Sequence, residues 1–319
     1  MATTDPTTDD TANSDDAEGP EAAENGPSAE SFEPETCLSF TISAKSAHFR
    51  KIEGNSTAQT YKVPPRTTVM GIVAAIIGDD RDTYYDRSRR SNAAYAVIPE
   101  TGLRTQQMVI SEVATNLDSL EKIGPDDDIT LPKTGTERHS QRNPYNYLQD
   151  VAYRIFVGFD RRAEEGDRAY TELCDRLEAG ESVYPVYLGR TDCLATIDYH
   201  GECDVSPLSA TTIDSAVYGE DPIDHIHMPS AQDMSDSNIG RLTLGLMESE
   251  RSPSEFERVD EDGSVRRRPL SWDTWTVRRD GMPISLTKEF PASRVVPRTG
   301  DETEEDDSGG QVEFTVMFS

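Results

Sequence analysis

The chain has 319 residues, and its 31 basic and 60 acidic residues give a formal net charge of −29. This acidic excess argues against a general electrostatic attraction to nucleic acid, because binding to phosphates requires cations. The distribution of charge changes that interpretation, since residues 37–115 hold ten Lys and Arg against seven Asp and Glu, whereas residues 1–36 carry eleven acids and no base. A locally basic sector therefore lies within an acidic protein.

Lysine is scarce, since only six of the 31 basic residues are lysine. A large acidic excess with few lysines is typical of proteins adapted to a salty cytoplasm, where carboxylates keep a protein hydrated and soluble. This composition predicts a haloarchaeal origin. Molar salt reduces the Debye length to about 3 Å, so a nucleic-acid site in such a protein would depend on short, direct contacts.

The cysteines and the N-terminus indicate the cellular compartment. The four cysteines, Cys37, Cys174, Cys193 and Cys203, show no C-x-x-C spacing and fit reduced thiols better than a disulfide framework. The first residues have neither the basic region nor the apolar region of a signal peptide. No apolar run approaches the roughly 20 residues of a membrane helix. We therefore expect a soluble, cytoplasmic protein.

Taken in order, the chain begins with residues 1–36, which are predicted to be a disordered acidic tail. Apolar and polar residues then alternate over 37–44, which predicts a strand with one buried face. In Val69–Ile77 the apolar residues recur at helical spacing, after Pro64-Pro65 and before a possible C-cap at Gly78. Between this strand and this helix lies a polar, basic segment.

The chain up to residue 200 alternates predicted strands with predicted helices. We expect helices at 82–90 and 167–179, and strands at 94–98, 106–113, 150–159, 182–188 and 193–198. A polar stretch at 115–142, interrupted by glycine and proline, is predicted to be a protruding hairpin. The order of elements predicts an α+β domain over residues 37–200 with the ferredoxin-like βαββαβ pattern of RNA-recognition folds.

Residues 201–319 are predicted to form a smaller, β-rich C-terminal region with an acidic loop at 300–309. Asp280-Gly281 is typical of a hairpin turn. The last strand, which alternates cleanly, is expected to return and pair with an existing sheet. The expected strands are 242–247, 272–277, 282–287 and 312–318.

Three pieces of sequence, in the same order along the chain, resemble the Cas family five proteins of CRISPR systems, which belong to the RAMP superfamily. They are AHFRK (47–51) with TYKVPPRTTVMGIVAAIIG (60–78) and Tyr84-Tyr85, then NPYNYLQDVAYRIFVGF (143–159), then YPVYLGRTDCLATI (184–197). Together they cover most of residues 37–200, whereas residues 201–319 are not strongly matched. The composition of a salty archaeon favours the type I-B branch of the family.

This resemblance implies a non-catalytic subunit of the Cascade surveillance complex, active in antiviral defence and without a cofactor or metal. Such a subunit binds the 5′ handle of the CRISPR RNA and caps the backbone filament. Its implied partners are this RNA, a Cas family seven backbone subunit and the large subunit, with target DNA only indirectly. A hairpin inserted in the ferredoxin-like domain acts as a thumb over the RNA, and residues 115–142 are its candidate.

The residue types of the basic segment agree with this implication. An RNA end requires cations for its phosphates, aromatic rings for stacking and polar groups for base edges and 2′-hydroxyls. Arg66 directly precedes the predicted helix, whose N-terminal N–H groups would reinforce an anion site. We therefore expect Arg66→Glu to lose RNA without unfolding. The candidate RNA-binding residues are Lys45, His48, Phe49, Arg50, Lys51, Tyr61, Lys62, Arg66, Thr67, Arg138, His139 and Arg142.

Other interpretations stay open at this point. Phe49 fits a core position as well as a stacking one, and His48 fits a structural histidine. His225 and His227 suggest a metal, but no third strong ligand lies near them in the sequence.

Two other functions also stay open. A metal-independent endoribonuclease, as in type I-C systems, would use Arg138-His139 where a Lys-His pair is expected, and arginine is a poor proton donor. An unrelated RNA-recognition module would share the fold but not the three ordered matches.

Overall fold

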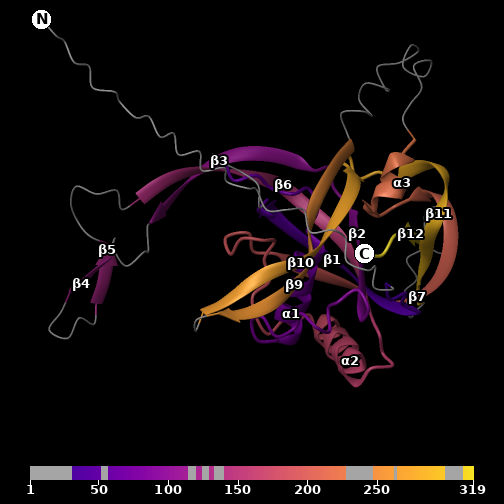
Figure 1. Cartoon of the computed structure of the whole chain (residues 1–319), viewed down its shortest axis with the longest axis horizontal. Helices are drawn as coiled ribbons and strands as arrows, with labels where there is room; N and C mark the ends of the chain where they lie inside the picture. The colour runs from indigo at the N-terminus through magenta and orange to yellow at the C-terminus, as the bar shows by residue number, and fades with distance from the viewer. Residues whose placement is uncertain are drawn as a thin grey trace, which may run out of the picture.

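The computed structural model describes residues 31–51, 57–113, 120–123, 129–132, 140–227, 247–261, 264–298 and 312–319. It mixes helices and strands, and most strands belong to one curled antiparallel sheet (Figure 1). The strands of this sheet are β1 (Thr36–Ala47), β2 (Ala93–Pro99), β3 (Arg104–Val113), β6 (Ser140–Phe159), β7 (Thr196–Ile213), β11 (Ile284–Pro297) and β12 (Phe314–Val316). Their order is β12-β11-β7-β1-β6-β2, with β3 also paired to β6.

Two helices cover one face of the sheet. Helix α1 (Arg66–Ile77) follows Pro64-Pro65 and ends at Gly78 with φ 91°, as the sequence predicts. Helix α2 (Glu164–Ala179) ends in the same way at Gly180, with φ 64°. The apolar faces of both helices pack against inward-facing residues of β1 and β6, and the fully buried members of this core include Phe40, Ile42, Val73, Tyr153, Ile155 and Leu173. Burying these faces is the main favourable contribution to folding.

A second sheet is built from the C-terminal region. It has the order β8-β10-β9, with β8 (Val217–Tyr218), β9 (Met247–Glu261) and β10 (Ser264–Arg278), and the short helix α3 (Glu220–Asp224) follows β8. Trp275 and Val277 of β10 lie in the same core as the two long helices. The predicted domain boundary at residue 200 lies inside β7.

Strands β3 and β6 extend together away from the body of the protein (Figure 1). Their pairing runs from Arg104 opposite Gln149 to Val113 opposite Ser140. Beyond them, β4 (Leu120–Ile123) and β5 (Ile129–Pro132) form a small hairpin of their own. The predicted protruding insertion is therefore present as strands, although Arg138 and His139 lie outside the described residues.

Several local predictions require correction. Residues 82–90 form turns rather than a helix, and 182–188 form a loop joined to Leu194 by an isolated bridge at Tyr187. Asp280-Gly281 makes a turn, but β10 pairs with β8 and β9 whereas β11 pairs with β7 and β12, so no hairpin joins them. The prediction that the last strand returns to an existing sheet is confirmed by the pairing of β12 with β11. Most of the strand expected at 242–247 lies outside the described residues.

Candidate functional site

The basic segment after β1 folds back on itself beside β6. The backbone N–H of Tyr61 donates to Phe49 O at 2.8 Å, and that of Lys51 donates to Gln59 O at 3.0 Å. Arg50 and Thr60 form an isolated antiparallel bridge between these two bonds. The Ala58 N–H donates to Pro144 O of β6 at 3.0 Å, and the Asn146 N–H of β6 donates to Ala58 O at 2.9 Å. The two described arms of the segment are thus paired as a narrow ribbon, in which Arg50 and Gln59 are exposed and most of the other side chains are buried.

Four of the predicted RNA-binding residues are accessible to a ligand. Lys45, Arg50 and Arg142 are exposed, and Thr67, in the first turn of α1, is half-buried. The three cations form no ion pair with a carboxylate among the residues that the structure describes. They are therefore available for contacts with an anion.

Arg66 is placed differently from the sequence prediction. Its side chain is buried, with 3% exposure, and the guanidinium donates to the carbonyls of Ser88 and Ala93 at 2.8 and 2.9 Å and to that of Ser319. It lies 4.6 Å from the ring centroid of Tyr95. Burial lowers the pKa of this guanidinium to about 10, so it stays cationic at neutral pH. The expected phosphate contact of Arg66 is corrected, because its guanidinium is hydrogen-bonded inside the protein to the segments that contain Ser88, Ala93 and Ser319.

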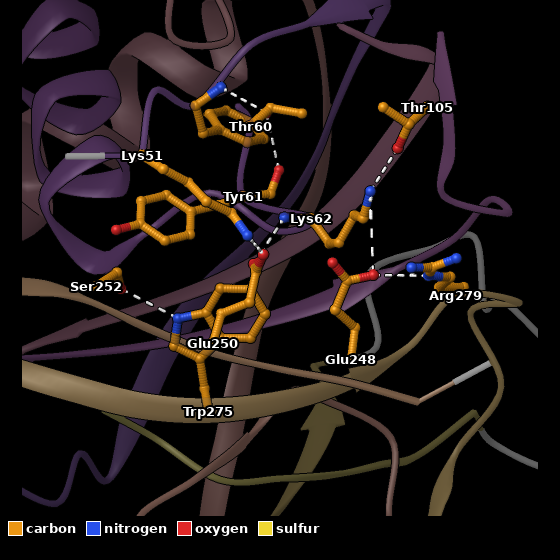
Figure 2. A network of polar contacts seen from close by, with 11 residues as sticks. Lys51, Thr60, Tyr61, Lys62, Thr105, Glu248, Glu250, Ser252, Trp275 and Arg279 are labelled. Atoms are coloured by element: carbon orange, nitrogen blue, oxygen red, sulfur yellow. Dashed lines mark hydrogen bonds and ion pairs between the residues drawn. The ribbon is translucent and has the colours of Figure 1, made fainter. Parts of the chain in front are cut away.

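Lys51, Tyr61 and Lys62 are held by the second sheet (Figure 2). The Lys51 ammonium pairs with Glu250, and Lys62 Nζ lies 4.0 Å from Glu248 and donates to Thr105 Oγ1. The ring of Tyr61 packs edge-on against Trp275, with 6.2 Å between centroids. The predicted RNA contacts of Tyr61 and Lys62 are corrected, since both side chains are buried against other parts of the protein, whereas Lys51 keeps part of its side chain in solvent.

Phe49 and His48 are also buried, with 2% exposure each. Phe49 packs in the core against Tyr153, so its expected stacking on a base is corrected. His48 Nδ1 donates to Asn146 O at 2.8 Å, and its ring lies against those of Tyr145 and Tyr147, with centroids 5.3 and 5.4 Å away. Burial lowers the pKa of His48, and the nearby charges of Arg190 and Arg50 lower it further, against opposing effects of the Asn146 hydrogen bond and Asp192.

A loop at 184–192 completes this cluster from the other side. The His48 N–H donates to Leu188 O at 3.1 Å. Gly189, with φ 87°, approaches the His48 carbonyl so closely that a side chain there would overlap it. This approach places Arg190 over the Tyr145 ring, 4.5 Å from its centroid.

The charges of this loop are linked to the aromatic rings below it. Asp192 accepts from Arg190 Nε and from the hydroxyl of Tyr147, both at 3.0 Å. The result is a group of residues, called here the His48 cluster, in which the buried rings of His48, Tyr145 and Tyr147 lie next to the more exposed Arg50, Arg190 and Asp192. Beside it the loop exposes Tyr184 and Tyr187 by 45% and 38%.

Comparison with known proteins assigns the family. A family model described as CRISPR-associated protein (Cas_Cas5) matches residues 37–285, which is most of the chain. The chain belongs to the Cas5 family. The match contains the basic segment, both long helices, the β3–β6 extension and the 184–192 loop, and it continues through β9 and β10. The comparison with curated protein sequences found no match.

Solved structures similar to this Cas5 chain are distant in sequence. A chain of a CRISPR RNA-guided surveillance complex is 13% identical, with 80% of this chain and 91% of that one covered and a TM-score of 0.40. A CRISPR protein from Archaeoglobus fulgidus is 12% identical, with coverages of 88% and 100% and a TM-score of 0.35. A chain of the type III-B Cmr-beta complex bound to cognate target RNA and AMPPnP is 11% identical, with coverages of 77% and 86% and a TM-score of 0.33.

Within the described part of this Cas5 chain, no group of three or more His, Cys, Asp and Glu side chains is arranged to hold a metal ion. None of the described helices is long and apolar enough to span a membrane. The sequence reasoning missed Arg190, Asp192, Tyr145 and Tyr147. For Arg190 and Asp192 the available signal was the run YPVYLGRTD, in which both residues follow Gly189 closely. The exposed Tyr184 and Tyr187 precede this glycine, and the buried Cys193 follows Asp192.

The buried His48 predicts a specific pH dependence of stability in this Cas5 protein. Its folded-state pKa lies below the ordinary value of 6.5, so the unfolded chain binds the proton more readily. Neutral His48 therefore makes its full contribution to the free energy of unfolding above pH 6.5. This contribution is lost as the pH falls through the lower pKa of the folded state. We expect the denaturant midpoint of the native sequence to fall more steeply, as the pH drops below about 6.5, than that of His48→Gln, which keeps a donor but does not titrate. Parallel curves would contradict this assignment.

Proposed function

We propose that this Cas5 protein is a non-catalytic subunit of a type I-B CRISPR surveillance complex, in which it binds the 5′ handle of the CRISPR RNA and caps the backbone filament. One observation carries the proposal: three segments of the family-matched region, far apart in sequence, converge on the His48 cluster. There the exposed Arg50 and the partly exposed Arg190 lie near the buried rings of Tyr145 and Tyr147, and the exposed rings of Tyr184 and Tyr187 lie beside them. Cations beside aromatic rings are the arrangement by which proteins bind single-stranded RNA.

The arrangement of the main sheet supports an RNA-binding fold. In this proposal the chain order β1-α1-β2-β6-α2-β7, with β3 to β5 inserted between β2 and β6, and the strand order β7-β1-β6-β2 correspond to the βαββαβ pattern of a ferredoxin-like domain. In this proposal the β3–β6 extension is the thumb, and the exposed Arg142 near its outer end contacts the RNA backbone. The adjoining subunits are a Cas7 backbone subunit and the large subunit, with target DNA reached only indirectly.

The charge of the protein as a whole gives the site its selectivity. With a net charge of −29, most of the surface repels a polyanion. RNA is therefore bound where cations stay accessible: Arg50 forms no ion pair among the described residues, and Arg190 is partly exposed although it pairs with Asp192. The ion pairs of Lys51 and Lys62 with Glu250 and Glu248 neutralise those two lysines. In the salty cytoplasm that we propose for this protein, the contacts of Arg50 and Arg190 with phosphates are short and direct.

The proposal is tested by purifying the tagged, full-length protein from a halophilic host in high-salt buffer, sequencing the bound RNA and identifying the bound proteins. Discrete CRISPR RNAs with a common 5′ end, together with a Cas7 subunit, are the expected result. Diverse RNAs, or none, would refute the capping role. Cleavage of precursor RNA by the isolated protein would refute the non-catalytic role.

Arg50→Glu is the corresponding site prediction. Because Arg50 is exposed and unpaired among the described residues, its reversal should leave folding intact and weaken RNA binding, with the dependence of log Kd on log salt concentration reduced by about one. The matched control is Arg168→Glu, which changes the net charge equally at an exposed position on α2. Equal losses in the two variants would show that net charge, rather than the His48 cluster, governs binding.

A further inference from the structure

A cavity lies between the basic segment and the β9–β10 strand pair. It has a volume of about 370 Å³ and is lined chiefly by Lys51, Gln59, Tyr61, Glu250, Arg251 and Trp272. This volume is in the range of pockets that bind small molecules. Lys51 directly follows Arg50 in the ribbon, so the cavity adjoins the proposed path of the RNA.

The outer wall of the cavity is an exposed aromatic ring beside a cation. Trp272 is 36% exposed, whereas Trp275, three residues later on the same strand, is 1% exposed. The guanidinium of Arg251 lies 5.4 Å from the centroid of the Trp272 ring. Arg251 is exposed and forms no ion pair within the part of the chain that the structure describes. The rim therefore presents a flat π surface and an unneutralised positive charge at one point.

The inner wall is fixed by buried charges (Figure 2). Glu250 accepts the Lys62 backbone N–H at 3.1 Å and pairs with the Lys51 ammonium. Lys51 in turn lies 5.6 Å from the centroid of the Tyr61 ring. These contacts hold the Lys51 ammonium, part of which faces solvent, at a set position relative to Trp272. Gln59 adds an exposed amide that can hydrogen-bond a base edge.

We propose that this cavity binds one nucleotide of the bound RNA, with its base stacked on Trp272 and its phosphate in contact with Arg251. The inference rests on the proposed RNA-binding function and adds a second, separate subsite to it. A polar lining with an exposed indole fits a nucleobase better than an apolar side chain of a protein partner. A single free cation suits one phosphodiester, as in a strand, rather than the several phosphates of a free nucleoside triphosphate.

The test is ultraviolet cross-linking of the full-length protein with the RNA that co-purifies with it, followed by mass spectrometry of the cross-linked peptides. The expected result is a nucleotide attached at Trp272. Trp272→Leu should remove this cross-link and weaken RNA binding roughly tenfold, as expected for the loss of one base–aromatic stack, whereas Trp272→Phe should retain most of the affinity. Leu270→Ala, a change at a neighbouring residue that is 40% exposed, is the matched control and should bind RNA normally.

The outcomes separate this subsite from the general RNA-binding function. RNA that stays bound while Trp272 is not cross-linked, with Trp272→Leu binding as well as the native sequence, would overturn the subsite and leave the proposed function standing. A native protein that retains no RNA would overturn both. Arg50→Glu should reduce the amount of bound RNA, but the RNA that remains should still cross-link to Trp272.

Discussion

Arg66→Glu is expected to destabilise the fold by more than about 3 kcal/mol, rather than only to lose RNA as the sequence suggests. Three backbone carbonyls, from Ser88, Ala93 and Ser319, direct their oxygens at the Arg66 guanidinium in the interior. Without that donor each of these carbonyls loses a hydrogen bond, and among the described residues only Ser319 O keeps a second one, from the Tyr95 N–H at 3.4 Å. A buried carbonyl left without a partner costs about 1–3 kcal/mol. A glutamate would add a buried negative charge facing three acceptors, which raises the cost further.

The measurement is the free energy of unfolding from denaturant titration in high salt. Arg66→Ala should lose about 3 kcal/mol or more, and Arg66→Lys should lie between it and the native sequence, because one ammonium cannot span all three carbonyls as a planar guanidinium does. The matched control is Arg50→Ala, an exposed arginine in the same basic sector, which should change stability by no more than about 0.5 kcal/mol. If Arg66→Ala proves as stable as Arg50→Ala, the buried role is wrong.

The difference between these two arginines explains how far the sequence could predict the site. Local periodicity identified β1, α1, β6 and α2, because one buried face imposes a repeat of two or 3.6 residues on neighbouring positions. The basic segment has no such repeat, so its sequence does not show which of its side chains are buried and which are exposed. Arg66 and Arg50 look alike in the sequence, and the groups that bury one of them come from Ser88, Ala93 and Ser319.

The same limit applies to the lysines. Lys51 and Lys62 are predicted to contact phosphates as cations of the basic segment, but Glu250 and Glu248 reach them from β9, far away in the sequence. The pairing of β9 with β10 and the packing of Trp275 against Tyr61 bring those carboxylates into place. Such long-range pairing has no local signal, and so the sequence placed the cations correctly in one sector but could not say which were already neutralised. Lys45, Arg50 and Arg142 are the cationic candidates that the structure leaves exposed.

Gly189→Ala is expected to have the second large effect, through the geometry of the His48 cluster. Gly189 has φ 87°, a conformation that costs a residue with a side chain about 1–3 kcal/mol. In addition, the new methyl group would overlap the carbonyl oxygen of His48, which is backbone and cannot rotate away. Relief requires the 184–192 loop to move off the basic segment, which breaks the bond from the His48 N–H to Leu188 O and removes Arg190 from the Tyr145 ring.

The variant should therefore lose more than about 2 kcal/mol of stability and, if the proposed function holds, bind RNA more weakly than its residual folded fraction explains. Gly180→Ala is the matched control, because Gly180 also has a positive φ, of 64°, but a side chain there meets nothing within 4 Å. Gly180→Ala should lose only the stability that a positive φ costs a residue with a side chain, about 1 kcal/mol, and should bind RNA normally. Equal stability losses in the two variants would show that the approach of Gly189 to His48 does not hold the loop. If the Gly189→Ala protein is destabilised but binds RNA normally per folded molecule, Arg190 does not contribute to RNA binding.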